Sequence, residues 1–373
     1  MKILSNPFLI SGYQGPAHFC NRNKETRSII SALENGRNVT LMSLRRMGKT
    51  GLIKHSFKQI KSKKFNLIYV DLLHTTDLST MISEFAKATI NQLSLGVMRS
   101  SLQKISTLFS SLRPTFKVDP LSGAPAVEID IQKGKQGVKT LEEIFTLLEQ
   151  HSTQVIVAFD EFQIITSYPE KNTEALLRSH IQHLNNVHFI YSGCQKHILS
   201  SMFADARRPF YQSTQFLNLE AINTKEYQTF INHHFKNAGI VLAKYEAEFI
   251  LDWTYQHTFY VQYFCNRLFD LKKAKAKATV HHAIDKIFEE NEAVFTNYRS
   301  LLTPQQSQLL TSVAKEGWVH KPTSKEFLSK HRLTSSTVQR TLPALIQKEF
   351  LIREKEGYRV YDVFLGRWLA EKF

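Results

Sequence analysis

The 373-residue sequence lacks the features that mark several classes of protein. No apolar run reaches the roughly 18 residues that a membrane span needs, so neither a transmembrane helix nor a membrane partner is predicted. Asn6 and Pro7 interrupt the first apolar stretch and no small-residue cleavage site follows, so we expect no signal peptide. The three cysteines (Cys20, Cys194 and Cys265) are too scattered for a disulfide framework or a metal cluster, which favours a reducing, cytoplasmic compartment.

Composition excludes a mostly disordered or collagen-like chain, because 42% of residues are hydrophobic and 22% are charged. The length suits two or three domains. The net charge of +15 is uneven: residues 1–100 carry fifteen Lys and Arg against five acids, 101–300 are balanced, and 301–373 carry twelve against seven. A basic excess indicates either anionic partners, such as phosphates, nucleic acid or an acidic membrane face, or a surplus of solubilising lysines.

Strand-like and helix-like segments alternate over residues 1–222, which predicts an α/β fold with a parallel sheet covered by helices on both faces. The expected strands are 38–42, 66–71, 155–159, 187–191 and 215–219. The expected helices are 49–60, 79–95, 140–150, 173–185 and 195–203. Thr140 and Glu143 match a capping box, so the third of these helices is expected to begin at Thr140. Two extended runs around Asp-Pro and Ser-Gly predict an inserted hairpin over 113–131.

The pattern becomes helical after residue 222. Helices are expected over 224–237, 244–256, 259–273 and 280–298, which predicts a helical lid subdomain over 223–300. Residues 301–373 predict a winged helix-turn-helix, with helices 304–315, 323–330 and 335–348 and wing strands 350–354 and 358–362. Gly357 can supply a positive φ in the wing turn. Pro343 argues against this assignment, because it should kink the third helix.

One motif directly follows the first expected strand and opens a helix, which is the context of a phosphate-binding loop. Backbone N–H groups of such a loop cradle phosphate oxygens. Gly48 allows close approach, Lys49 brings charge to the β- and γ-phosphates, and Thr50 offers a hydroxyl to Mg²⁺. The candidate nucleotide-binding residues are Ser43, Leu44, Arg45, Arg46, Met47, Gly48, Lys49, Thr50 and Gly51.

Ser43 stands where the usual pattern of this loop has glycine. Serine can fill that position if its φ stays negative. Arg45 and Arg46 can serve phosphates or pair with acids of the same domain.

Two acids end the expected strand 155–159. In P-loop ATPases the first acid, here Asp160, supports Mg²⁺, and the second, Glu161, polarises the attacking water as a general base. The alternative is an acidic strand end that faces solvent.

Two further polar positions are candidates for catalysis. Ser192, with Gln195 as second choice, follows strand 187–191 and could sense a γ-phosphate; an ordinary turn is the alternative. Arg208, next to Arg207, could neutralise transition-state charge in cis or from a neighbouring subunit; a surface basic pair is the alternative.

Several segments together resemble a family of archaeal and bacterial AAA-type P-loop ATPases related to the STAND class. The resemblance rests on residues 19–22 (FCNR), 41–50 (LMSLRRMGKT), 159–163 (FDEFQ) and 254–265 (TYQHTFYVQYFC). It implies ATP and Mg²⁺ binding, slow hydrolysis, and nucleotide-driven rearrangement of the lid and winged helix. It places Arg22 near the nucleotide. Asn21 replaces a family glycine, and the lid segment lacks the Gly-x-Pro of STAND relatives.

Three functions remain open: an ATP-hydrolysing switch, a nucleotide-regulated DNA-binding protein, and a degenerate P-loop scaffold that binds nothing. The candidate DNA contacts are Ser335, Ser336, Gln339 and Arg340 on the third helix of the winged unit, and Lys355 and Arg359 on its wing. Winged helices also serve protein contacts. The 113–131 hairpin is the expected site for a protein partner, and a homo-oligomer is open. The phosphate ligand leaves unexplained the lysines Lys54, Lys58, Lys61, Lys63 and Lys64.

Overall fold

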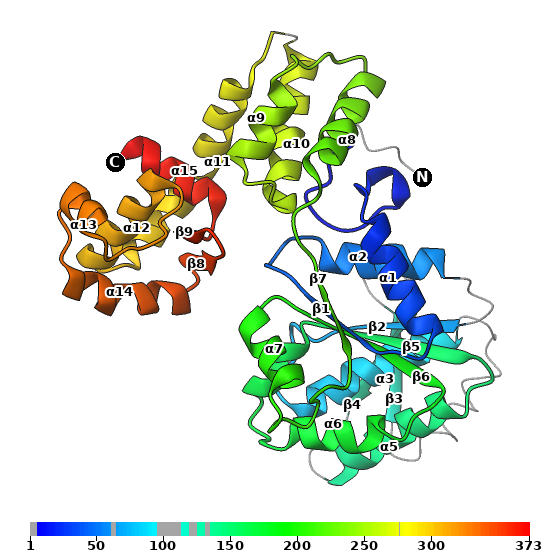
Figure 1. Ribbon diagram of the computed structural model, residues 1–373. Helices are drawn as coiled ribbons and strands as arrows, with labels where there is room; N and C mark the ends of the chain where they lie inside the picture. Colours follow the sequence, from blue (N-terminus) through cyan, green and yellow to red (C-terminus); the bar gives the residue numbers. More distant parts are fainter. Residues whose placement is uncertain (1–5, 61–64, 95–112, 119–124, 131–134, 276) are drawn as a thin grey trace. The chain divides into compact units, whose positions relative to one another are not determined.

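The computed structural model describes residues 6–60, 65–94, 113–118, 125–130, 135–275 and 277–373 (Figure 1). Two compact units make up the chain: Gly12–Ala221, and Met1–Ser11 together with Ile222–Phe373. The range 1–222 expected for the ATPase core therefore includes residues 6–11, which belong to the other unit. None of the helices in the described ranges has both the length and the apolar character needed to cross a membrane.

A five-stranded parallel sheet forms the centre of the first unit, as predicted (Figure 1). Its order is β2-β5-β6-β1-β7. The strands are β1 (Val39–Met42), β2 (Phe65–Asp71), β5 (Gln154–Asp160), β6 (Val187–Gly193) and β7 (Gln215–Asn218). Strand β6 separates β1 from β5. The carboxyl ends of β1, β5 and β6 therefore meet at one edge of the sheet.

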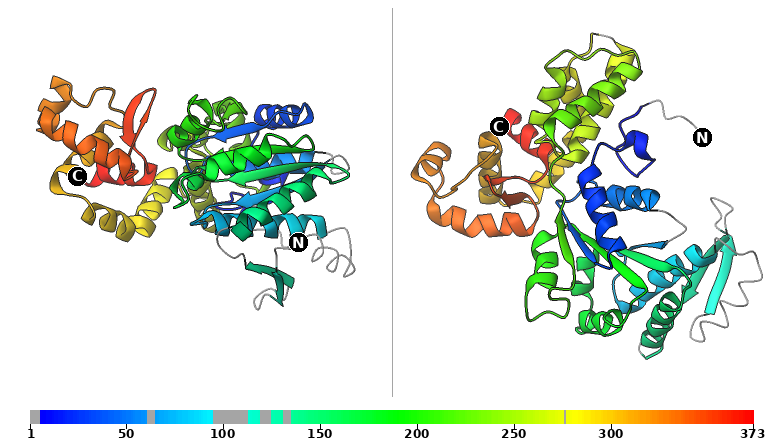
Figure 2. Two further views of the ribbon diagram at one scale, coloured as in Figure 1. Left: turned by 90° about the horizontal axis from the view of Figure 1, so that it is seen from below. Right: turned by 45° about the vertical axis from the view of Figure 1, so that its right-hand side comes forward.

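Alternating residues of β5 supply the cores on the two faces of the sheet. Ile156 and Ala158 belong to the core that includes residues of helices α1 and α2. Val157 and Phe159 belong to the opposite core, under α3, α5, α6 and α7. A strand buried on both faces reads as a continuous apolar run, which is why 155–159 was recognisable in the sequence. Figure 2 shows the helices on both sides of the sheet.

The helical segments of this unit agree closely with expectation, apart from α1 and the short 3₁₀ helices η1 and η2, which are additional. They are η1 (Pro16–His18), α1 (Asn23–Glu34), α2 (Lys49–Gln59), α3 (Leu78–Ser94), α5 (Lys135–Glu149), η2 (Phe162–Ser167), α6 (Thr173–Ile181) and α7 (Lys196–Ala204). The expected start at Thr140 is wrong, because α5 begins at Lys135 and Thr140 is a buried residue within it.

The predicted hairpin is present as the antiparallel pair β3 (Arg113–Val118) and β4 (Pro125–Asp130). Arg113 pairs with Asp130 at its open end, and Val118 pairs with Pro125 next to the turn. The turn itself, at 119–124, lies outside the described residues.

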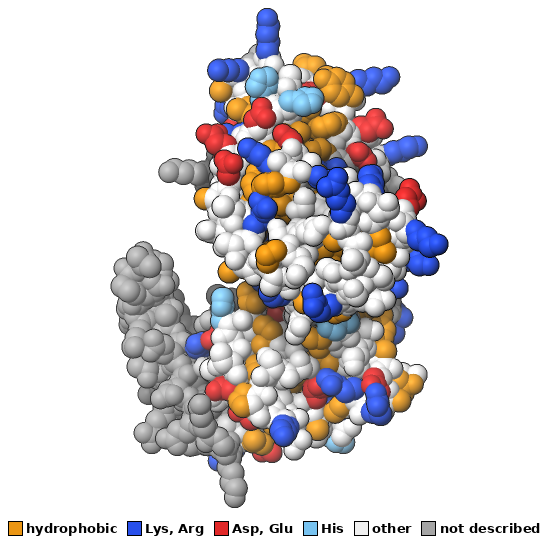
Figure 3. Space-filling model, turned by 90° about the vertical axis from the view of Figure 1, so that its left-hand side faces the viewer, with side chains coloured by type: hydrophobic (Ala, Val, Ile, Leu, Met, Phe, Trp, Pro, Cys, Tyr) orange, Lys and Arg blue, Asp and Glu red, His pale blue; other side chains and the backbone are white. Residues whose placement is uncertain are grey.

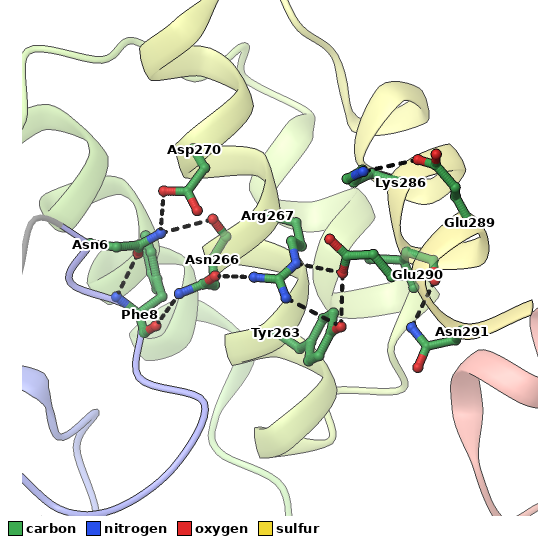
Figure 4. Close-up of polar contacts among 11 residues, drawn as sticks. Asn6, Phe8, Tyr263, Asn266, Arg267, Asp270, Lys286, Glu289, Glu290 and Asn291 are labelled. Atoms are coloured by element: carbon green, nitrogen blue, oxygen red, sulfur yellow. Dashed lines mark hydrogen bonds and ion pairs between the residues drawn. The ribbon is translucent and has the colours of Figure 1, made fainter. Parts of the chain in front are cut away.

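Four helices begin the second unit: α8 (Thr224–Asn237), α9 (Glu246–Trp253), α10 (Thr258–Ala274) and α11 (Val280–Ser300). The N-terminal segment packs against them. Phe8 is 1% exposed and lies among the rings of Phe230, Phe235 and Phe269. Figure 4 shows how hydrogen bonds fix its backbone: the Asn266 side chain donates to the Phe8 carbonyl at 2.8 Å.

Asn6 provides a second attachment of the same segment. Its side-chain amide donates to the Asn266 carbonyl at 2.9 Å and to Asp270 at 2.8 Å (Figure 4). These bonds and the buried ring of Phe8 make residues 6–8 an integral part of the helical region.

The winged unit has the predicted three helices and two-stranded wing. Its elements are α12 (Pro304–Glu316), α13 (Lys325–His331), α14 (Ser335–Gln347), β8 (Leu351–Glu354), β9 (Gly357–Val360) and an additional helix, α15 (Val363–Lys372). α14 continues through Pro343, so this proline does not prevent the three-helix arrangement. Gly357 has the expected positive φ, 124°, and an added Cβ there would meet the Val319 carbonyl at 2.5 Å.

Replacing Phe8 by Ala should lower the free energy of unfolding of the second unit by about 3–5 kcal/mol, because it leaves a cavity in an aromatic core. All three tryptophans, Trp253, Trp318 and Trp368, lie in this unit. Urea unfolding followed by tryptophan fluorescence therefore reports on it selectively. Val241→Ala, at a side chain 88% exposed, is the matched control and should change stability by less than about 0.5 kcal/mol. Equal stability of the two variants would contradict the packing described for Phe8.

Candidate functional site

The loop between β1 and α2 has the backbone geometry of a phosphate cradle. Its residues with positive φ are Arg46 (62°) and Gly48 (95°). Ser43 is not among the positive-φ residues, so the condition for serine in place of glycine is met. Its hydroxyl is buried and donates to the Leu44 carbonyl at 2.7 Å, which closes the first turn of the loop.

The side chains of the loop divide into buried and exposed sets. Lys49 is 5% exposed and Met47 6% exposed, whereas Arg45, Arg46 and Thr50 face solvent. Burial of a lysine is costly unless its charge meets a partner. The Lys49 Nζ lies 3.9 Å from Glu161 Oε1, so this acid is its partner within the protein.

Asp160 and Glu161 meet the phosphate loop at the carboxyl end of β5, as the sequence predicts. The Thr50 hydroxyl donates to Asp160 Oδ2 at 2.6 Å. The Glu161 backbone N–H donates to the other oxygen of Asp160 at 3.1 Å. Glu161 itself has a φ of 55°, a left-handed conformation that costs about 1–3 kcal/mol in a non-glycine residue. The acids are therefore held in defined positions and do not form a free solvated strand end.

Tyr69 on β2 is a member of this site that sequence reasoning missed. Its hydroxyl donates to Asp160 Oδ2 at 2.7 Å, the same oxygen that accepts from Thr50. Burial, and then the charge of Asp160, raise the pKa of Tyr69, so it remains a donor at neutral pH. The pairing of β2 with β5 places it there, and no local sequence signal announces that pairing.

Gln163 is the second missed residue. Its side-chain N–H donates to Glu161 Oε2 at 2.6 Å and lies 3.7 Å from Cys194 Sγ. Gly193 leaves the space that this side chain occupies, because an added Cβ would overlap Gln163 Oε1. Burial raises the pKa of the Cys194 thiol to about 12, and the Glu161 charge adds to the effect. The Gln of the Asp-Glu-Phe-Gln motif was the available signal.

Ser192 lies on β6 in register with Leu41 of β1, between the phosphate-loop strand and the acidic strand. The residue is fully buried, and its hydroxyl has no hydrogen-bond partner among the described residues. Gln195, the second choice, is the partly buried N-cap residue of α7. The sheet order thus places Ser192 beside the site, while its role as a sensor stays a prediction.

Arg208 forms an ion pair within its own unit. Its guanidinium contacts the Glu174 carboxylate of α6, with Nε 3.1 Å from Oε2. Burial raises the pKa of Glu174, and Arg208 opposes that shift. Arg207 is 88% exposed and pairs with Asp205 at 2.8 Å. A role for Arg208 at a transition state would require it to leave Glu174.

Arg22, the residue just before α1, is buried and contacts the segment at which the chain leaves the core unit. Its Nη1 donates to the Glu220 carbonyl at 2.6 Å and to Glu25 at 3.0 Å. Its Nη2 is buried without a hydrogen-bond partner among the described residues. The residue therefore ties the start of α1 to the last residues of the core unit.

The segment before Arg22 lies along α2. Phe19 stacks on His55 with ring centroids 4.3 Å apart, and the Tyr13 hydroxyl is 2.9 Å from His55 Nδ1. An added Cβ at Gly51 would touch Phe19 at 3.4 Å, so the phenylalanine covers the first turn of α2. Burial lowers the pKa of His55.

Two of the unexplained lysines of α2 lie over aromatic rings. The Lys54 Nζ is 5.1 Å from the Tyr69 ring centre, and the Lys58 Nζ is 5.1 Å from that of Tyr13. Lys61, Lys63 and Lys64 fall outside the described residues.

The candidate DNA contacts of the winged unit fall into an exposed set and one buried residue. Five are exposed as expected: Ser335, Ser336, Gln339, Arg340 and Lys355. The assignment of Arg359 is wrong, because it is only 3% exposed. It donates to Glu354 at 3.0 Å and lies over the Trp318 ring, so it supports the wing from within.

The residues present fit a magnesium ion. The hydroxyl of Thr50 and the carboxylate of Asp160 are hard oxygen ligands, which Mg²⁺ prefers alongside phosphate oxygens. Thr50 Oγ1 and Asp160 Oδ2 lie 2.6 Å apart. Within the described part of the chain, no group of three or more His, Cys, Asp or Glu could form a separate metal centre.

The fold and this site define the class: a P-loop ATPase fold joined to a winged helix. A family model described as "ATPase domain predominantly from Archaea" matches residues 19–256, and one described as "Probable winged helix domain" matches residues 293–371. Because the first model covers more than half of the chain, the protein belongs to this ATPase family, as the sequence motifs indicated.

Solved structures share the fold along almost the whole chain. A Walker-type ATPase of Pyrococcus abyssi is 16% identical, with a TM-score of 0.63, and the match covers 97% of this chain and 99% of that one. The ORC2 protein of Aeropyrum pernix, in ADPNP-ADP complexes, is 14% identical, with a TM-score of 0.59 and coverage of 98% and 96%. The ORC1 protein of Aeropyrum pernix in complex with DNA is 13% identical, with a TM-score of 0.55 and coverage of 99% and 97%. A search of curated proteins found no match.

Gly193→Ala should destabilise the core unit by about 1–3 kcal/mol, because the new methyl group overlaps Gln163 Oε1. The same change in a Gln163→Ala background should cost less, since the overlapping atom is gone. Urea unfolding followed by far-UV circular dichroism of the four proteins forms a double-mutant cycle. Additive effects would show that Gln163 does not occupy the space beside Gly193.

Proposed function

We propose that this chain is a Mg²⁺-dependent ATP-binding and ATP-hydrolysing molecular switch of the AAA/STAND type. The observation that carries the proposal is the convergence of Lys49, Thr50, Asp160 and Glu161 at the carboxyl edge of the sheet. A degenerate scaffold is disfavoured, because Ser43 fits its position without positive φ and a buried lysine is kept within the loop.

Each residue of the candidate site has a physical task in this proposal. The loop N–H groups and the N-terminus of α2 bind the phosphates, and Lys49 neutralises their charge. Thr50 and Asp160 would hold Mg²⁺, which when bound neutralises charge that develops on the phosphate oxygens. Glu161 takes a proton from the attacking water as general base. Gln163 orients Glu161, and Tyr69 fixes the Asp160 oxygen that Thr50 also contacts.

Before phosphates bind, Lys49 is the only cation paired with Glu161 among the described residues. A triphosphate would draw Lys49 toward itself, since it offers several negative oxygens. Glu161 would then keep its contacts with Gln163 and Cys194 and, without the lysine, be released to accept a proton. Ser192, next to the same edge, would sense the γ-phosphate.

Coupling to the second unit is proposed to pass through the core terminus. Arg22 holds the Glu220 carbonyl, one residue before the core unit ends at Ala221. A shift of Arg22 on nucleotide binding would move that connection and change the lid and winged helix. Arg208 would act as the arginine finger, in cis or in trans, after release from Glu174.

The second candidate function is nucleotide-regulated DNA binding through the winged helix. It is favoured by the exposed polar residues on the first turns of α14, the position from which helix-turn-helix proteins contact bases. The A. pernix ORC1 protein, which shares the fold, was solved in complex with DNA. A protein partner at the 113–131 hairpin, a homo-oligomer and a cytoplasmic location remain further proposals.

Lys49→Ala should abolish ATP binding, and Glu161→Gln should keep binding while lowering kcat by about 10²-fold or more. The first loses the charge at the phosphates, and the second keeps shape while losing the base. Binding of a fluorescent ATP analogue and phosphate release, each with and without Mg²⁺, measure the two effects. Arg207→Gln, at an exposed position away from the loop, is the control and should retain both activities. ATP turnover that is unchanged in both variants would refute the proposal.

Arg340→Gln should weaken binding of duplex DNA and flatten its salt dependence, if α14 contacts the duplex. Loss of one phosphate contact reduces the log–log salt slope by about 1, whereas loss of a base contact changes sequence preference instead. Fluorescence anisotropy over a salt titration separates the two. Arg353→Gln, an exposed wing position not assigned to DNA, is the control. No duplex binding at low salt would remove this second function.

A further inference from the structure

A groove of about 520 Å³ lies in the winged unit, and its lining includes none of the candidate nucleotide-site residues. It is formed by the end of α11, one side of α12 and the C-terminal end of α13. Its basic lining residues are Arg299, Lys315, Lys330, His331 and Arg332. Ser307, Gln308, Thr311 and Ser312 also line it, and the Ser312 hydroxyl donates to the Gln308 carbonyl at 2.8 Å. No acid is among the residues that line this groove, so its surface offers hydrogen-bond donors and positive charge together.

Three of the basic residues are held in place by neighbours within the unit. Lys330 and His331 both contact Glu316 Oε1, at 2.8 and 2.6 Å. The Lys330 contact, opposed by burial and helped by His331, lowers the pKa of Glu316, so this acid stays ionised and anchors both groups. Arg299 lies over the Phe373 ring at 3.8 Å, and its buried Nε has no hydrogen-bond partner among the described residues.

Two other cations have no acidic partner in the described part of the chain. Lys315 is exposed on the last turn of α12. Arg332 is exposed in a left-handed conformation, φ 51°, at the end of α13. The Gln308 side chain fixes this end by donating to the His331 and Arg332 carbonyls at 3.2 and 3.4 Å. The groove thus holds two cations, Lys315 and Arg332, that no acid in the described part of the chain pairs with.

We infer that this groove binds phosphate groups, and that they belong to a nucleic-acid strand. Phosphate oxygens accept from both cations and hydroxyls, and a lining without carboxylates imposes no repulsion on them. The groove includes no residue of α14 or of the wing, so it would be a second place at which the winged unit contacts an anion.

The position of the groove next to the start of α14 favours a nucleic-acid strand as the source of the phosphates. Only Leu333 and Thr334 separate Arg332 from Ser335, the first residue of α14. A strand seated in the groove would therefore continue toward the exposed Ser336 and Arg340. Figure 3 shows Lys and Arg side chains on this side of the molecule, interspersed with Asp and Glu side chains. The Phe373 ring, half-exposed at the groove, offers a surface on which a base can stack.

The test measures binding of a fluorescein-labelled oligothymidylate of about 20 nucleotides to the full chain over a salt titration. Lys315→Gln and Arg332→Gln should each weaken binding about fivefold to tenfold near 0.1 M salt and reduce the log–log salt slope by about 1. Lys236→Gln removes the same charge from exposed α8 and should leave affinity and slope unchanged. Wild-type affinity and slope in both groove variants would overturn the inference.

Two competitors identify the ligand chemistry. Polyglutamate that displaces the oligonucleotide as well as an equally charged polyphosphate would overturn the phosphate assignment and indicate an acidic protein segment instead. Inorganic tripolyphosphate whose binding depends on Lys315, combined with oligonucleotide binding that does not, would overturn the nucleic-acid source in favour of a free phosphate compound. Lys49→Ala should bind the oligonucleotide like wild type, so failure of the ATPase proposal would leave this result intact.

Discussion

The parallel pairing of β6 between β1 and β5 is the constraint on which the candidate site depends. Because all three strands run in one direction, their carboxyl ends bring together the phosphate loop, the two acids and Ser192. The hydrogen bond from Thr50 to Asp160 closes this arrangement across 110 residues of sequence. The packing that supports the pairing comes from apolar residues on both faces of β5, so the site is as stable as the core beneath it.

Two residues with a strained backbone lie at the same edge of the sheet. Arg46 and Glu161 adopt left-handed conformations, which non-glycine residues maintain only where surrounding contacts hold them. For Glu161 these contacts are Lys49 and Gln163, and Gly193 makes the space for Gln163. Local strain is therefore balanced by polar contacts that also orient the acid. The same contacts therefore hold the backbone of Glu161 and orient its carboxylate for the role that we propose.

The second unit illustrates a different use of polar groups. Arg359 is buried under the wing and packs on Trp318, while Lys315 and Arg332 face an open groove without acidic partners in the described ranges. In the sequence these cations look alike, and its position on the wing placed Arg359, with Lys355, among the expected DNA contacts. Burial excludes Arg359 as a DNA contact, because its charge is already paired inside the domain and is not exposed to a ligand. The positive charge of this region is accessible to a ligand only where tertiary packing leaves it uncovered.

The sequence alone determined the α/β class, the phosphate loop, the acid pair and the winged helix, because these depend on apolar periodicity and on short motifs. It could not place Tyr69 or Gln163, which reach the acids through strand pairing and through a space left by Gly193. Thr140 matched a cap locally, yet α5 begins at Lys135. Pro343 remains inside α14. At Thr140 and Pro343 the fold overrides a local preference of about 1–3 kcal/mol, and at Tyr69 and Gln163 it adds contacts between elements that only the tertiary structure brings together.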